Sequence, residues 1–109
     1  SDLTIPEDKF IDTPEFQHLL TYKKLTPLLL KKIRKKEQIE ESVLKTYQAS
    51  NPSLYYVYEV IGDYYEAMQQ SKQAIAYWQQ ALKKSIPKLQ EKERIQQKIQ
   101  KQSKDGKES

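Results

Sequence analysis

The chain has no cysteine, one histidine and only two glycines among its 109 residues. Without cysteine it can form no disulfide, iron–sulfur cluster or thiolate zinc site, and one histidine leaves little imidazole for metal binding or general-base catalysis. Loops that cradle phosphates need several glycines, because the backbone must approach the phosphate closely. We therefore expect no cofactor, no nucleotide site and no catalytic activity in this chain.

Long apolar runs are also missing. The longest aliphatic run is Leu28-Leu29-Leu30, far short of the roughly 20 apolar residues that a membrane span needs. The first twenty positions are acidic and lack the apolar stretch of a signal peptide. We therefore expect neither a membrane span nor a signal peptide. The sequence leaves the compartment undetermined, with the cytoplasm as the default. Because residue 1 is serine and not methionine, we expect the chain to be a segment of a longer protein.

The charge that is present comes in blocks of alternating sign. Residues 1–20 and 37–80 are net acidic, residues 21–36 hold seven basic residues and no acidic one, and residues 81–109 are again basic, for a total of +4. This alternation favours neighbouring helices with complementary surfaces over a nucleic-acid footprint, which would concentrate one sign on one face.

Prolines and apolar spacing divide the chain into helices. Thr13-Pro14 is a cap followed by a proline in the first turn, and apolar residues then recur at three- and four-residue intervals as far as Ile33. Thr26-Pro27 repeats the cap inside this stretch, which predicts either a kink or two helices end to end. Four further helices are expected to end near Asn51-Pro52 and residues 68, 85 and 101. No stretch alternates like a strand, so the predicted class is all-α with about five helices.

Large and small residues alternate over the 34 residues from Tyr55 to Lys88 in an order typical of one known repeat. The residues concerned are Tyr58, Ile61, Gly62, Tyr65, Ala74, Trp78, Ala81 and Pro87. In length and pattern the stretch resembles a tetratricopeptide repeat (TPR), although Pro87 falls one residue past the family's usual proline. The small residues would let two antiparallel helices approach closely, and the aromatic ones would fill the volume around them.

The preceding stretch keeps the architecture of a repeat but has lost its motif. A shift of 35 residues aligns Pro87 with Pro52, yet it also aligns Gly62 with Pro27. The resemblance implies a short right-handed solenoid of antiparallel helix pairs. Its predicted parts are a flexible segment at 1–12, a degenerate helix pair at 13–52, the repeat at 53–87, a capping helix at 88–103 and a disordered tail at 104–109.

Two such units fall short of the roughly three that a solenoid needs to bury a continuous core. Three things could cover the remaining surface: the rest of a longer polypeptide, a second copy of the chain, or the long first helix folding back on the pair.

The resemblance also implies a binding groove lined by the first helix of each pair. In this repeat the groove positions are Tyr56, Glu59, Asp63, Glu66 and Ala67. Family members that clamp a peptide carboxylate carry Lys and Asn where this chain has Glu59 and Asp63, which argues against that ligand. A basic or amphipathic segment suits the acids better, either a foreign peptide or residues 31–36 of the same chain. The alternative is that these acids only solvate the helix.

Three other groups have simpler structural explanations than functional ones. A basic patch closes the first predicted helix, where cations favour the helix dipole; contact with phosphate or anionic lipid and docking to a partner are the alternatives. Its members are Lys31, Lys32, Arg34, Lys35 and Lys36. The aromatic residues match packing positions better than a base-stacking platform, with Tyr56 and Tyr64 expected to be partly exposed. His18 has no second ligand one turn away, so a metal or catalytic role is not expected.

We therefore expect a non-catalytic module that mediates contacts between proteins or domains. A second resemblance supplies the alternative: Asp12-Thr13-Pro14-Glu15-Phe16, the stretch from Asn51-Pro52 to Tyr65, and Ile86-Pro87 are similar to the C-terminal extension of bacterial acyltransferase and penicillin-acylase-like amidohydrolases. The nucleophile of that N-terminal-nucleophile class is a cysteine, which this chain lacks. Any such activity would lie in an upstream domain, with this chain as an accessory domain. The expected partner is a protein, a domain of the same parent chain or a second copy, and not nucleic acid.

Overall fold

The computed structural model describes residues 13–108, so the predictions for residues 1–12 and for Ser109 lie outside the described part. Five helices make up the described chain, and it contains no strand, which confirms the all-α class. The helices are α2 (Pro14–Arg34), α3 (Glu41–Ser50), α4 (Tyr55–Ala67), α5 (Ser71–Leu82) and α6 (Leu89–Glu108). None of the described helices is long and apolar enough to cross a membrane.

Helix α2 begins as its sequence predicts and continues through Pro27. The Thr13 side chain accepts a hydrogen bond of 3.3 Å from the backbone N–H of Phe16, and Pro14 occupies the first turn, where no N–H is needed. Of the two outcomes predicted at Pro27, the structure has one helix that spans the proline. Because proline has no backbone N–H, the carbonyl of Lys23, four residues before Pro27, lacks its helical hydrogen bond. Both residues are exposed, so water can bind this carbonyl.

Two helices end without glycine in turns that normally favour glycine. Lys36 and Gln69 have positive φ angles of 56° and 60°. After α2, the N–H groups of Lys36 and Glu37 donate back to the carbonyls of Ile33 and Lys32, and the same pair of bonds closes α4 at Gln69 and Gln70. This pair of backbone hydrogen bonds is the Schellman motif, in which a residue in the left-handed conformation lets the chain reverse direction sharply.

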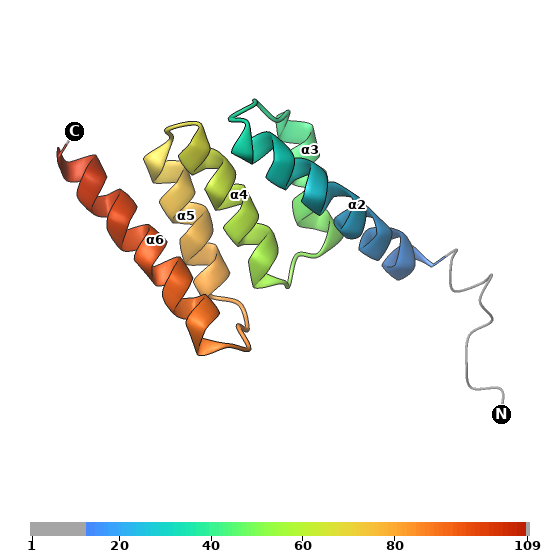
Figure 1. Ribbon diagram of the computed structural model, residues 1–109. Helices are drawn as coiled ribbons and strands as arrows, with labels where there is room; N and C mark the ends of the chain where they lie inside the picture. Colours follow the sequence, from blue (N-terminus) through green and yellow to red (C-terminus); the bar gives the residue numbers. More distant parts are fainter. Residues whose placement is uncertain (1–12, 109) are drawn as a thin grey trace.

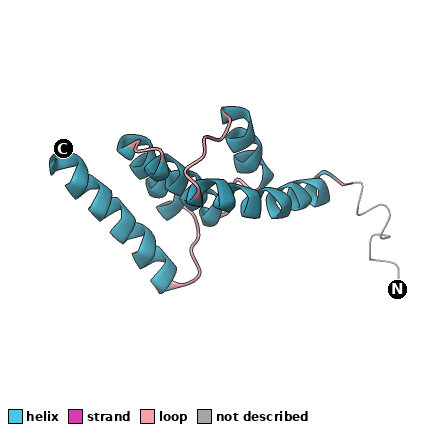
Figure 2. Cartoon of the chain, turned by 45° about the horizontal axis from the view of Figure 1, so that its top comes forward, coloured by secondary structure: helices cyan, strands magenta, loops and turns pink. Residues whose placement is uncertain are grey.

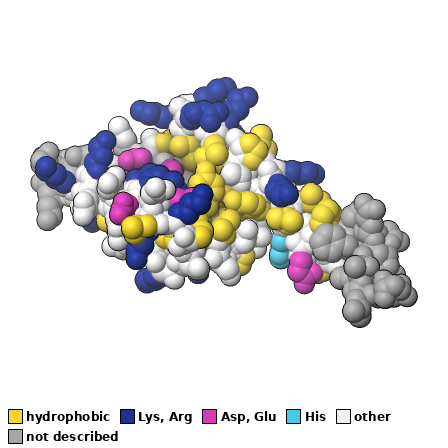
Figure 3. All heavy atoms as spheres, turned by 60° about the horizontal axis from the view of Figure 1, so that its bottom comes forward, with side chains coloured by type: hydrophobic (Ala, Val, Ile, Leu, Met, Phe, Trp, Pro, Cys, Tyr) yellow, Lys and Arg dark blue, Asp and Glu magenta, His cyan; other side chains and the backbone are white. Residues whose placement is uncertain are grey.

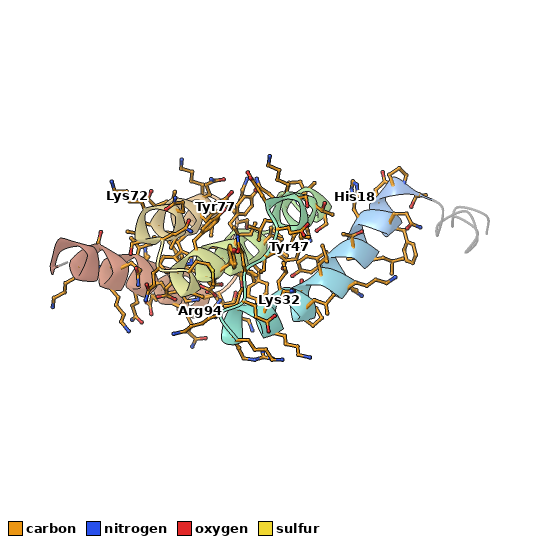
Figure 4. All side chains as sticks on the ribbon, turned by 90° about the horizontal axis from the view of Figure 1, so that it is seen from above. His18, Lys32, Tyr47, Lys72, Tyr77 and Arg94 are labelled. Carbon is orange, nitrogen blue, oxygen red and sulfur yellow. The ribbon has the colours of Figure 1, made fainter. Side chains whose placement is uncertain are left out.

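The helices lie in a row with α4 in the middle. Figure 1 shows α4 between α2 and α6, while Figure 4, seen from above, places α3 and α5 on one side of the row and α6 with the second half of α2 on the other. Each helix packs on the next along the chain, and α2 also packs on α4. The first half of α2 extends beyond the other helices (Figure 2).

Helix α4 supplies more of the core than any other helix because neighbours surround it. Eight of its thirteen residues are buried, including Val57, Val60 and Ile61. Trp78 of α5 packs fully buried against it, next to Gly62. A Cβ at Gly62 would overlap Cδ1 and Nε1 of Trp78 and lie 3.1 Å from the Ala74 carbonyl, so only glycine permits this approach.

A tyrosine cluster joins α2 to α3. The rings of Tyr22 and Tyr47 stack with centroids 5.7 Å apart, and the Tyr47 hydroxyl lies 2.8 Å from Thr26 Oγ1. Tyr47 is fully buried, and its hydroxyl therefore needs this partner. Leu29 is the buried residue of α2, so α2 contributes to the core mainly through its second half.

Candidate protein-binding surface

The predicted groove residues lie on α4, and α6 covers part of the face that they form. Glu59, Asp63 and Glu66 follow one another at spacings of four and three residues, so they share one face of the helix. Along α6, Arg94, Lys98 and Gln102 follow at spacings of four. These two rows of polar side chains meet each other, and we call their contacts the α4–α6 polar ladder.

Glu59 is the most tightly bound member of the ladder. Arg94 Nε donates to one carboxylate oxygen at 2.8 Å and Arg94 Nη2 to the other at 2.7 Å, a bidentate geometry. Lys98 Nζ adds a third bond of 2.8 Å. Glu59 is only 1 % exposed, and its buried charge is therefore balanced by two cations from α6.

Asp63 and Glu66 continue the ladder toward the end of α4. Asp63 receives bonds from Lys98 Nζ at 3.0 and 3.1 Å and from the indole N–H of Trp78 at 3.1 Å. Glu66 accepts from the side-chain amide of Gln102 at 3.1 Å, and Gln102 in turn accepts from the Ser71 hydroxyl at 2.7 Å. At the other end the Tyr55 hydroxyl donates to Glu91 of α6.

The two carboxyl groups respond differently to this environment. Burial alone would raise the pKa of Glu59, but hydrogen bonds from Arg94 and Lys98 outweigh burial, and the pKa lies below its ordinary value. Burial dominates at Asp63 and raises its pKa despite Lys98. The pKa of Lys98 is itself raised, because the attraction of both carboxylates exceeds the effect of burial. Hydrogen bonding to Glu59 raises the pKa of Arg94.

The face of α4 is thus not the open acidic groove that the sequence suggested. Its negative charge is met by cations of α6, which was not among the occupants that the sequence suggested. Arg94, Lys98 and Gln102 lie in the predicted capping helix but were not predicted as partners of this face. Their four-residue spacing, which matches the acids of α4, was the signal that could have revealed them.

The open part of this face is a pocket of about 480 Å³ beside the ladder. It lies where α2 ends and over the second half of α4. Its lining residues are Ile33, Lys36, Asp63, Glu66, Ala67, Gln69 and Lys98. The two left-handed residues at the ends of α2 and α4 both belong to this lining. Asp63 remains 24 % exposed, so the pocket offers apolar, acidic and basic groups together.

Tyr56 completes the predicted groove set, and it lies apart from the pocket. Its ring is half-buried, and the electrostatic influence of Tyr22 reaches it from α2. Burial, followed by the charge of Glu59, raises its pKa. Tyr64 was expected to be partly exposed but is buried: its hydroxyl accepts from the backbone N–H of Ile39 at 3.1 Å and lies 3.3 Å from the Ile39 carbonyl. These bonds hold the loop before α3 against α4.

Most residues assigned to repeat packing are buried. Tyr58, Ile61, Gly62, Ala74, Trp78 and Ala81 are buried, Tyr65 is half-buried and Pro87 is exposed. Tyr65 stacks on Tyr77 of α5 with centroids 5.5 Å apart. The aromatic residues of α4 and α5 therefore pack on one another instead of forming an open platform.

All five side chains of the basic patch are exposed, and Ile33, which lies between them in the sequence, is half-buried. Its one ion pair among the described residues joins Lys32 to Glu37 at 3.8 Å, between half-exposed side chains. Lys36 lines the pocket together with Asp63 and Glu66 but forms no ion pair with them. In Figure 3, lysine and arginine side chains gather at one edge beside a strip of apolar side chains. His18 is exposed, and the described residues contain no group of side chains suited to hold a metal.

Comparison with known protein families, curated proteins and solved structures gives no significant match. The likeness to TPR proteins therefore rests on the residues of the chain itself.

Proposed function

We propose that this chain is a TPR-like helical-repeat module that mediates contacts between proteins or between domains of one chain. The observation that carries the proposal is the α4–α6 polar ladder with its adjoining pocket. One face of α4 holds a basic amphipathic helix by charged hydrogen bonds to Glu59 and Asp63. The same face continues into an open pocket of about 480 Å³, where a second chain segment can be held next to α6.

Two features of the packing support the kinship with TPR proteins. Helices α4 and α5 form a helix pair within the 34-residue stretch. Gly62 and Trp78, which stand at positions of the repeat motif, are in close contact between them. Helix α4 also has a neighbour on each side: α2 packs on it, and Arg94 and Lys98 of α6 reach its Glu59, as contacts between first helices of successive repeats would require. In the alternative function, in which the chain is an accessory domain of a larger enzyme, the same pocket would bind a segment of the catalytic domain.

Site-specific photo-crosslinking in the native cells tests this proposal. A photoreactive benzoylphenylalanine replaces Ala67, which lines the pocket, and in a matched control replaces Ala76, which is exposed on α5. We expect an adduct of one defined mass from position 67 and none from position 76, with a protein partner identified by mass spectrometry. No adduct at position 67, or equal labelling at both positions, would contradict the proposal.

A further inference from the structure

A second surface, separate from the pocket on α4, lies between α2 and α3. It contains a pocket of about 410 Å³. The lining residues are Leu25, Leu28, Leu29, Lys32, Gln38, Ile39, Glu40 and Val43. Five of these are aliphatic, and Leu28 is 56 % exposed at the rim. None of them belongs to the lining of the pocket on α4, so the two surfaces can be tested independently.

Lysines surround the exposed leucine on the same face of α2. Lys24, Lys31, Lys32 and Lys35 stand four residues before and three, four and seven residues after Leu28, positions that share one side of a helix. All four are exposed. Only Lys32 has an ion-pair partner among the described residues, the half-exposed Glu37.

Helix-dipole stabilisation does not account for the whole arrangement. A cation at a helix C-terminus acts within the last turn, whereas Lys24 lies well before the end of α2 at Arg34. Solubility explains lysines, but it does not explain an exposed leucine at the rim of an aliphatic pocket between them. The lining holds one lysine, Lys32, and one acid, Glu40, so the excess of positive charge comes from Lys24, Lys31 and Lys35 beside the pocket on the α2 side. An apolar recess with cations along one side is the complement of apolar side chains flanked by carboxylates.

We propose that this α2–α3 surface docks an acidic amphipathic helix of a partner protein. The partner's apolar side chains enter the pocket beside Leu28 and Val43, and its Asp and Glu side chains face Lys24, Lys31 and Lys35. Helix-in-groove binding of this kind draws affinity from the apolar anchors and orientation from the charges.

Two other occupants fit the surface less well. A second copy of the chain would bring the same lysines against one another, because a symmetric contact places like surfaces together. A membrane takes up apolar side chains that protrude, whereas Leu28 is the only exposed one of the five aliphatic lining residues, and Leu29 and Ile39 are buried in the wall of the pocket.

Fluorescence anisotropy with a designed probe tests the proposal. The probe is a labelled synthetic helical peptide with leucine along one face and glutamate beside it, titrated with the full chain. We expect saturable binding that Lys31→Glu/Lys35→Glu weakens at least about tenfold. The matched control Lys72→Glu/Lys83→Glu has the same net charge, alters two exposed lysines elsewhere, and should change the affinity less than about twofold. Figure 4 shows Lys72 on the opposite side of the row from Lys32.

A second variant separates the apolar anchor from the charges. Leu28→Gln keeps every charge and alters an exposed position, so circular dichroism should be unchanged while binding weakens at least about fivefold. Absence of binding, equal loss in both double variants, or full affinity of Leu28→Gln would overturn the proposal. So would light scattering that shows a concentration-dependent dimer abolished by Lys31→Glu/Lys35→Glu, or binding to phosphatidylserine vesicles that outcompetes the peptide.

Discussion

Glu59 and Asp63 stand one helical turn apart on α4, and their charges have opposite effects on stability. The pKa of Glu59 is lowered in the folded state, so its ionised form favours folding at neutral pH. The pKa of Asp63 is raised, so ionising this group disfavours folding. One lysine, Lys98, contacts both carboxylates. The position of that ammonium group between them determines how much of each charge is compensated.

The Glu59→Gln variant should show a weaker dependence of stability on acidic pH. In the native chain the contribution of Glu59 is present above its unfolded pKa and is lost as pH falls through the folded pKa, which lies lower. Asp63 is present in both proteins, but its pKa should be raised less in the variant, because repulsion from the Glu59 charge is one of the causes that raise it. The variant should be less stable by about 1–2 kcal/mol at pH 7, with a smaller difference near pH 3. Urea unfolding of the native chain and the variant between pH 7 and pH 3 measures the free energy of unfolding of each. A difference between the two that stays the same at every pH would contradict the role assigned to Glu59.

At the scale of the elements, the packing of α4 on α5 depends on one position without a Cβ. Trp78 is fully buried and its indole N–H is held by Asp63 and by the Glu59 carbonyl, so the ring cannot move away cheaply. The residue that it covers is Gly62. The two helices are therefore held at a separation that larger side chains would increase.

Gly62→Ala should destabilise the fold by about 1–2 kcal/mol, since the cost of overpacking exceeds the gain in helix propensity. Ala74→Phe, at a fully buried position of α5, should cost more. The measurement is urea unfolding followed by circular dichroism. A stability equal to or above that of the native chain for Gly62→Ala would mean that the helices do not approach as closely as described.

How far the sequence predicts these elements depends on whether the signal is local. Thr13-Pro14 and Asn51-Pro52 mark helix boundaries chemically, and the helix that starts at Thr13-Pro14 and the turn at Asn51-Pro52 lie where predicted. The reversals at Lys36 and Gln69 carry no glycine, and only the bonds around them reveal the Schellman turns. The end of α6 at Glu108 instead of near Lys101 likewise has no local marker.

The candidate site was harder to predict than the fold for a similar reason. The residues of α4 were identified, because the spacing of Glu59 and Asp63 is visible in one stretch of sequence. Their partners Arg94 and Lys98 are 35 residues away in each pair. How the helices pack determines whether residues 21–36 or residues 81–109 supply the cations for the acidic face of α4. The alternation of charge along the sequence is compatible with either basic block.

At the scale of the whole molecule, the helices are held by interactions of different kinds. Helix α4 is buried on most sides by apolar contacts. Helix α6 is mostly polar: among its described side chains Ile95 is the fully buried one, and the helix packs on α5 and binds α4 through the polar ladder. Salt screens partly exposed ion pairs while leaving apolar burial in place. The molecule should therefore open in stages.

Hydrogen exchange measured at low salt and at 1 M NaCl should reveal these stages. We expect the amides of α4 to exchange slowest under both conditions, and those of α6 to exchange faster and to accelerate several-fold at high salt. Global unfolding measured by urea under each condition is the control for overall stability. If α4 and α6 exchanged with equal protection at both salt concentrations, the chain would behave as one cooperative unit and this expectation would fail.

Trp78 gives this molecule a built-in spectroscopic reporter. It is the one tryptophan of the chain, and its indole N–H bonds to Asp63, which Lys98 of α6 also contacts. Its emission therefore depends on the α4–α5 contact directly and on the attachment of α6 through the shared carboxylate. The fluorescence of Trp78 can thus report, without any added label, on both the core and the helix that covers it.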